Sequence, residues 1–415
     1  MSKSENTGGA KRKRMVAGTF SGTNLALAGG HNQRATLQAI RVKSPITRQD
    51  LVEMTGLTAP AIANITKKLL ADGLIAEVGR VRGGRGQPAK MLAINPDGCF
   101  SIGVNIDRDH ITIVALDLLG RVRARTTHEV DFALPAAVVK LFRNETDYFF
   151  NKVGIPRDKV IGIGVALPDD LGKIALPKQP DSYSIWSDAD IEGVFTNILD
   201  LPTYVENDAT AAAIGEMHFG LGLQYSSFFY VLVTWGLGGG VVVDEVYYRG
   251  ANGRSGEIGF LPVETGQDGA GPRALQDIVS LSALYEFLRA RGHEVAAPSD
   301  IDNQQPELQA LLEEWAEQAA SHLLEPITSI NCLLNPGAVL IGGRLPGVVA
   351  DILTEKLNAK RRFQKMRLPW ARRFSRLATC CFQPGPPCSS PRGEQGGAAP
   401  VCAGRINYIF LFYLI

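Results

Sequence analysis

The chain has 415 residues, a net charge of +1 and a hydrophobic fraction of 45%. This length exceeds what one hydrophobic core usually holds, so we expect two or three soluble globular domains. No apolar run reaches the roughly 18 residues that a membrane-spanning helix needs, and no apolar segment follows the basic run at 11–14 as it would in a signal peptide. Four of the six cysteines come after residue 379. They do not suggest a disulfide framework, so we expect a protein of the reducing cytoplasm.

Positive charge is concentrated at the front of the chain. Residues 1–93 carry 15 Lys and Arg against 5 Asp and Glu, whereas the remainder carries 28 against 37. A basic front on an acidic body predicts that the front binds a polyanion. Residues 1–30 are rich in Gly, Ser, Thr, Ala and Lys and show no periodicity, which predicts a disordered arm.

Residues 31–93 have the pattern of a helix-turn-helix. A first helix is predicted from Asn32, and a second spans 48–54 with Thr47 as its N-cap. A turn at Gly56 follows, and Thr58 caps a third helix that has a proline in its first turn. In a helix-turn-helix this last helix reads base edges in the major groove.

Two strand-like runs, Leu74–Val78 and Ala89–Ile94, flank a tip rich in Gly and Arg. Such a hairpin is typical of a wing, and Arg85 at its tip suits the negative potential of a narrow minor groove. We therefore predict a winged helix-turn-helix that binds DNA; the alternative is a small helical domain with a solvated charged face. The predicted DNA-binding residues are Thr58, Ala59, Pro60, Ala61, Asn64, Lys67, Lys68 and Arg85.

Residues 94–373 alternate between strand-like and helix-like segments. Strands are predicted at Ser101–Ile106, Ile111–Leu116 and Val160–Leu167, and an Ala-rich helix at Ala209–Phe219. The second half of this body repeats the style of the first. The pattern predicts a two-lobed α/β architecture.

Three short motifs stand between these elements. Val205–Thr210 places the carboxylate of Asp208 after a strand and at the start of a helix, and Ser255–Phe260 places Glu257 between glycines. Thr234–Gly240 follows an apolar strand, and its glycines permit positive φ and close approach of the backbone to a ligand. Loops that merely join strands would need no ligand. The predicted glycine loop comprises Gly236, Gly238, Gly239 and Gly240.

The three motifs in this order resemble the ROK family of sugar kinases and sugar-responsive repressors. The resemblance implies an actin-like ATPase fold in which ligands bind between two lobes. It also implies that Asp208 matches the base of the kinases, and that Asn207 and Glu257 hydrogen-bond other sugar hydroxyls. The alternative for Asp208 is a role as N-cap of its own helix, and the two roles are compatible.

Several positions depart from the family pattern. The kinases begin this domain with an Asp-x-Gly-Gly-Thr phosphate loop, where this chain has Asn105–Asp109, and Asp107 would repel a triphosphate. Many members hold a structural zinc through a His and clustered Cys, but Phe260 occupies the His position and 264–280 contains no Cys, so we predict no zinc. The turn at 166–170 also differs from the family's, which leaves the sugar preference open.

Residues 374–415 change character: they are rich in Pro, Gly, Ser, Cys and Arg and end in a short apolar run. Related proteins continue with a strand and a helix, and nothing in this composition favours either. The hypothesis is a frameshifted or misjoined C-terminus, and the alternative is a genuine disordered extension.

These observations favour a sugar-responsive transcription factor that binds operator DNA and a sugar or sugar phosphate. Of the two modes of regulation, we expect repression. A homodimer is expected because a helix-turn-helix usually reads two half-sites. No enzyme activity, cofactor or membrane partner is expected. The alternatives are an ATP-dependent sugar kinase with an added DNA-binding front, and a constitutive DNA-binding protein whose body only dimerises.

Overall fold

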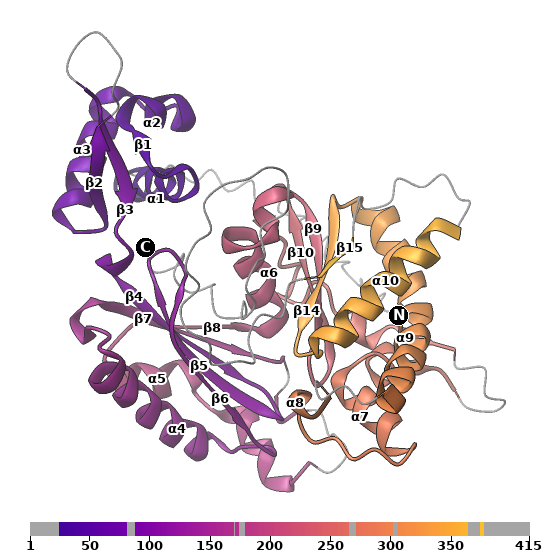
Figure 1. The fold of residues 1–415 in the computed structure, drawn as a ribbon. Helices are drawn as coiled ribbons and strands as arrows, with labels where there is room; N and C mark the ends of the chain where they lie inside the picture. Colours follow the sequence, from indigo (N-terminus) through magenta and orange to yellow (C-terminus); the bar gives the residue numbers. More distant parts are fainter. Residues whose placement is uncertain are drawn as a thin grey trace, which may run out of the picture. The chain divides into compact units, whose positions relative to one another are not determined.

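The computed structural model describes residues 25–80, 88–169, 171–173, 179–264, 271–301, 306–363 and 374–376. The chain forms two units, Met1–Ile94 and Asn95–Ile415, which are described separately (Figure 1). None of the helices in the described part is long and apolar enough to cross a membrane.

The first unit combines three helices with a small antiparallel sheet whose order is β1-β3-β2. Thr47 caps α2 in a capping box with Asp50, Gly56 ends that helix in the left-handed conformation, and Thr58 caps α3. These caps were predicted from the sequence and are confirmed. The elements are α1 (Leu25–Lys43), β1 (Ile46–Thr47), α2 (Arg48–Thr55), α3 (Ala59–Ala71), β2 (Ile75–Arg80) and β3 (Lys90–Ile94).

One boundary of this unit corrects the sequence analysis. Helix α1 begins at Leu25, so residues 25–30 are helical and do not belong to a disordered arm. The strong helix formers Leu and Ala at 25–28 outweigh the two glycines that follow, and the helix continues into the segment that was predicted to be helical. Residues 1–24 of the predicted arm lie outside the described part of the chain.

The second unit contains two five-stranded sheets with the same topology. In each sheet the first three strands form an antiparallel meander, and the last two strands add in parallel beside the first. This duplication confirms the two-lobed architecture. The first sheet has the order β6-β5-β4-β7-β8, with β4 Phe100–Ile106, β5 His110–Asp117, β6 Val122–Glu129, β7 Val160–Leu167 and β8 Thr203–Asn207. The second has the order β11-β10-β9-β14-β15, with β9 Phe228–Val233, β10 Leu237–Val243, β11 Val246–Tyr247, β14 Ala338–Gly343 and β15 Phe374–Arg376.

Strand β15 corrects the prediction that no element follows Arg373. It pairs in parallel with β14 and supplies the fifth strand of the second sheet. A backbone ladder needs no particular side-chain pattern, so a segment of unfavourable composition can still extend a sheet edge. The rest of the predicted tail lies outside the described residues.

Helix α6 (Asp208–Phe219) contacts both sheets (Figure 1). Its alanines allow this close approach: Ala209, Ala212 and Ala213 pack against β9, while Ala211 meets Ala166 of β7. The first turn of α6, including Asp208, is therefore held in the interior of the unit.

The other helices cover the outer faces of the sheets. Helices α4 and α5 pack on the first sheet around Phe142 and Phe195, and α7, α9 and α10 pack on the second around Leu284, Leu323 and Leu353. The remaining α-helices are α4 (Pro135–Tyr148), α5 (Ile191–Leu199), α7 (Leu281–Arg289), α8 (Pro298–Ile301), α9 (Pro306–Leu334) and α10 (Gly347–Phe363). The short strands β12 (Pro262–Val263) and β13 (Arg273–Ala274) form a separate ladder.

Candidate functional site

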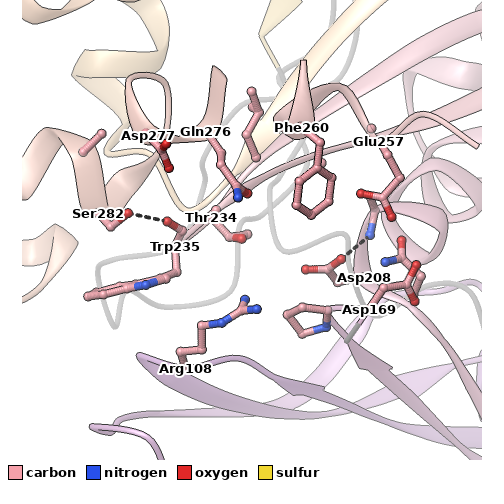
Figure 2. A pocket seen from close by; sticks show the side chains of 18 of the residues that line it. Arg108, Asp169, Asp208, Thr234, Trp235, Glu257, Phe260, Gln276, Asp277 and Ser282 are labelled. Atoms are coloured by element: carbon pink, nitrogen blue, oxygen red, sulfur yellow. Dashed lines mark hydrogen bonds between the residues drawn. The ribbon is translucent and has the colours of Figure 1, made fainter. Parts of the chain in front are cut away.

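A pocket of about 430 Å³ lies in the second unit, where ends of both sheets meet α6 and α7. Its walls come from the β4–β5 turn, the end of β7, the start of α6, the β9–β10 hairpin and the segment around Glu257 (Figure 2). Residues that line the pocket include Arg108, Asp169, Asn207, Asp208, Trp235, Gly236, Arg254, Glu257, Phe260, Ser282 and Tyr285.

Asp208 is the first residue of α6, and its carboxylate faces the pocket (Figure 2). The N-cap of α6 is Asn207, whose Oδ1 accepts a hydrogen bond from the Thr210 amide at 3.0 Å. The alternative that Asp208 caps its own helix is therefore wrong. Asp208 Oδ1 instead accepts from the Ala209 amide at 2.8 Å, which leaves its other oxygen available to a ligand.

The surroundings of Asp208 favour its neutral form. Burial, followed by the charge of Asp107, raises the pKa of Asp208 to about 7, because both make the carboxylate costly. The group can therefore act as a hydrogen-bond donor or acceptor near neutral pH. Sugar hydroxyls need both kinds of partner.

Glu257 and Asp169 lie near Asp208 at the same end of the pocket (Figure 2). Burial, and then the charge of Asp169, raises the pKa of Glu257, while Arg254 at 3.5 Å partly offsets this effect. The sequence analysis did not assign Asp169 to the site. The sequence did carry a signal for Asp169, because it follows the carboxyl end of the buried strand β7. That strand lies beside β8, which ends at Asn207.

The glycine run between β9 and β10 corrects the predicted loop. Only Gly236 belongs to the turn, where its carbonyl accepts from the Thr234 amide at 3.0 Å, whereas Gly238, Gly239 and Gly240 lie in β10. None of the four has a left-handed φ. Glycine is needed there for close packing: a Cβ on Gly239 would lie 2.6 Å from the Gly256 carbonyl oxygen. The backbone of β10 pairs with that of β9 in the sheet.

A chain of polar contacts occupies the β4–β5 turn. Asn105 Nδ2 lies 2.8 Å from His110 Nε2, and His110 Nδ1 lies 2.7 Å from Asp109 Oδ1. Arg344, which follows β14 of the second sheet, donates to Asp109 at 2.6 Å and to Glu129 at 2.5 Å. The turn is thus joined to the second lobe through Arg344.

The charge state of Asp109 follows from these contacts. Burial by itself would raise the pKa of Asp109, but the hydrogen bond from His110 and the charge of Arg344 lower it. Asp109 therefore stays ionised and holds Arg344 across the two sheets.

Metal-binding geometry is limited in the described residues. Asp107, Asp109 and His110 offer ligand atoms within 4.8 Å of one another. Both ring nitrogens of His110 already have partners, and Asp109 is bonded to Arg344. Phe260, which the resemblance matches to the family's His, is 46% exposed and lines the pocket. The absence of zinc stays a prediction.

The predicted DNA-binding residues of the first unit lie on and just before α3. Thr58 Oγ1 accepts from the Ala61 amide at 3.4 Å, and the buried face of α3 comprises Ile62, Thr66 and Leu69. Arg85 lies outside the described residues. Thr58, Ala59, Pro60, Asn64, Lys67 and Lys68 are exposed, and Ala61 is half-buried.

Fold and site together define a winged helix-turn-helix unit followed by a two-lobed, actin-like unit with a pocket. The ROK family model matches residues 101–367, and the chain belongs to this family. A model described as winged helix-turn-helix DNA-binding matches residues 31–76.

Two relatives are transcriptional regulators by description. The chain is 28% identical over 277 residues to the xylose repressor of Bacillus spizizenii, covering 65% of this chain and 71% of that protein. It is 25% identical over 368 residues to the DNA-binding transcriptional dual regulator NagC of Escherichia coli, covering 81% and 88%.

Two solved structures share the fold. The first is a ROK family transcriptional regulator described as a homolog of the E. coli MLC protein, with a TM-score of 0.61 and 22% identity, over 82% of this chain and 89% of that one. The second is a ROK family glucokinase from Streptomyces griseus, with a TM-score of 0.51 and 20% identity, over 67% and 94%. At these identities the similarity concerns the fold.

Proposed function

We propose that this protein is a sugar-responsive DNA-binding transcriptional regulator, of the repressor type, of carbohydrate-utilisation genes. One observation carries the proposal: the chain combines two features. The first is the exposed helix α3 of the winged helix-turn-helix, and the second is the carboxylate-lined pocket of the ROK unit. The repressor and regulator relatives, which cover 65% and 81% of this chain, support it. The chain would act in the cytoplasm as a homodimer on operator DNA.

The exposed surface of α3 is suited to a DNA groove. Lys67 and Lys68 point away from the core formed by Ile62 and Leu69, and the N-terminal turn of the helix is exposed. In a helix-turn-helix the first residues of this helix meet base edges, whereas lysines further along bind phosphates.

The pocket provides the sugar-binding part. Asp208, Asn207, Asp169 and Glu257 surround one end with carboxylate and amide groups, which match the alternating donors and acceptors of a sugar. A sugar that binds two conformations of the body with different affinities changes DNA occupancy by that difference.

A kinase activity is the alternative function, and the β4–β5 turn argues against it. Asp107 is buried there, and Asp109 is already bonded to Arg344. Phosphoryl transfer depends on positioning and on neutralising phosphate charge, and two carboxylates in this turn work against both. We propose that Asp208 contacts the ligand and transfers no proton to or from a phosphorylated hydroxyl, and that neither zinc nor another cofactor is needed.

The test measures operator binding by the purified chain with a panel of pentoses, hexoses and amino sugars. A sugar that changes operator affinity of the parent should have no such effect on the Asp208→Asn variant, which should still bind the operator. Lys67→Ala should weaken operator binding without removing the sugar response. A panel of sugars that leaves operator occupancy unchanged would contradict the proposal. Sugar-dependent release of ADP from ATP, lost in Asp208→Asn, would favour the kinase.

A further inference from the structure

Arg48 is a cation of the first unit that the predicted DNA-binding residues do not include. It is the first residue of α2, directly after the N-cap Thr47, and its side chain is 35% exposed. Its guanidinium reaches two other elements of the same unit, the helix α3 and the strand β2 (Figure 1). Arg48 therefore contacts both the helix and the strand hairpin that are expected to meet DNA.

The contact with α3 is made on the buried side of that helix. Arg48 Nε donates to Thr66 Oγ1 at 2.9 Å, and the fully buried Thr66 donates in turn to the Ile62 carbonyl at 2.8 Å. A hydrogen bond from a charged group is strong and directional, so it fixes where α3 lies against the start of α2. Asn64 and Lys67 of the same helix are exposed. Arg48 thus holds α3 from behind and leaves its exposed side to DNA.

The contact with β2 lies at an irregular position of the hairpin. Arg48 Nη2 is 4.0 Å from Glu77 Oε1, and Glu77 also pairs with Lys90 of β3 at 2.7 Å. The register of β2 against β3 shifts between Glu77 and Gly79. Because such a bulge bends and twists a strand locally, the contact acts where the course of the hairpin changes.

These contacts bear on orientation more than on stability. Ion pairs as exposed as those of Glu77 contribute little to the free energy of unfolding. Hydrogen bonds to base edges, by contrast, weaken steeply when donor and acceptor are misaligned. A small rotation of α3 about Thr66 should therefore cost specific affinity, while contacts to phosphates, which carry no sequence information, should survive it.

We propose that Arg48 is a positioning residue for DNA recognition, which holds α3 and the β2–β3 hairpin in one relative orientation through Thr66 and Glu77. This proposal rests on the proposed DNA-binding function and adds a residue to it. The competing role is a direct contact between the guanidinium and a DNA phosphate, and it predicts different results in the same experiment.

The experiment measures binding of the purified full-length chain to two duplexes across a range of salt concentrations. One duplex is selected by the parent chain from a random-sequence library, and the other is a scrambled duplex of the same length and composition. The variants are Arg48→Met, Arg48→Lys, Thr66→Val and the double variant Arg48→Met with Thr66→Val. Lys67→Ala represents a phosphate contact, and Arg34→Met is the matched control, because it removes an exposed arginine from α1.

Arg48→Met should bind the selected duplex about 10-fold more weakly than the parent, as expected for the loss of one well-formed base contact. Its affinity for the scrambled duplex and its salt dependence should match those of Arg34→Met, which removes the same charge. Arg48→Lys should remain as weak as Arg48→Met, since an ammonium lacks the fork that reaches two partners. Thr66→Val should also weaken specific binding, and it should add nothing to Arg48→Met because both changes break one contact.

Amide hydrogen exchange of peptides from α2 and α3 distinguishes positioning from stability. At the temperature of the binding assay α3 should stay protected in Arg48→Met, so that the lost affinity belongs to folded molecules. If Arg48→Met did not fold, Thr66→Val, which keeps the charge, would provide the same comparison. A loss of affinity that equals the rise in the unfolded fraction would give Arg48 a structural role alone and overturn the proposal.

Three other outcomes would also overturn it. Equal losses on both duplexes, with a salt slope lowered by about 1 as in Lys67→Ala and restored by Arg48→Lys, would make Arg48 a phosphate contact. An affinity of Arg48→Met equal to the parent's on both duplexes would exclude a role in recognition while leaving the DNA-binding function intact. If the parent selected no sequence at all, the proposed DNA-binding function would fall, and this proposal with it.

Discussion

Replacing Asp208 by Asn should make the body of this protein more stable at alkaline pH while removing its response to sugar. Asp208 is 8% exposed, and burial, followed by the charge of Asp107, raises its pKa from 3.8 to about 7. An amide cannot ionise, but its oxygen can still accept from the Ala209 amide. The variant therefore removes the cost of a buried charge and keeps the local hydrogen bond.

The sign and size of the effect follow from the two pKa values. Because the folded-state pKa is raised, the folded chain holds the proton more tightly than the unfolded chain does. The stability that this provides is complete below the unfolded pKa and is lost as the pH rises through about 7. About three pKa units at about 1.4 kcal/mol each amount to about 4 kcal/mol, of which about 2.5 kcal/mol is lost between about pH 5 and about pH 8.

The measurement is urea unfolding of the parent and of Asp208→Asn from about pH 5 to about pH 8, with tryptophan fluorescence as the signal. All four tryptophans belong to the second unit, so the signal reports on the unit that contains Asp208. The free energy of unfolding of the variant should gain about 2.5 kcal/mol on the parent over this range. Asp147→Asn, an exposed position on α4, is the control and should follow the parent. Curves for parent and Asp208→Asn that stay parallel across the range would refute the reasoning.

Three further predictions concern the bridge between the sheets, DNA binding and metal content. Arg344→Met leaves the buried carboxylate of Asp109 without its cation and should destabilise the second unit by about 3 kcal/mol; a urea midpoint equal to the parent's would contradict the bridge between the sheets. Lys67→Ala should lower the salt dependence of DNA binding, and replacing Arg85 should weaken specific binding by about 1–3 kcal/mol; affinities that match the parent's at every salt concentration would exclude the winged-helix interpretation. Elemental analysis should find no stoichiometric zinc, since Phe260 stands at the family's His position, and one zinc per chain would be the contrary result.

Local sequence determined much of the secondary structure and part of the site. Thr47 and Thr58 cap the helices that they were predicted to cap, because a cap depends on residues within one turn of it. Strand β7 has the predicted bounds, since its apolar run is short and nearly uninterrupted. Asn207, Asp208 and Glu257 were assigned by the resemblance to a family, and the structure brings all three to one pocket.

Tertiary structure decided what depends on residues far apart in the chain. Gly238–Gly240 look like a loop in the sequence but form a strand, because their backbone pairs with β9 and their lack of side chains admits α6 and Gly256. The contact between Asp109 and Arg344 joins residues 235 positions apart, and no local pattern signals it. The raised pKa of Asp208 likewise depends on the folded pocket, because its burial and the nearby charge of Asp107 arise only when both sheets and α6 have packed together.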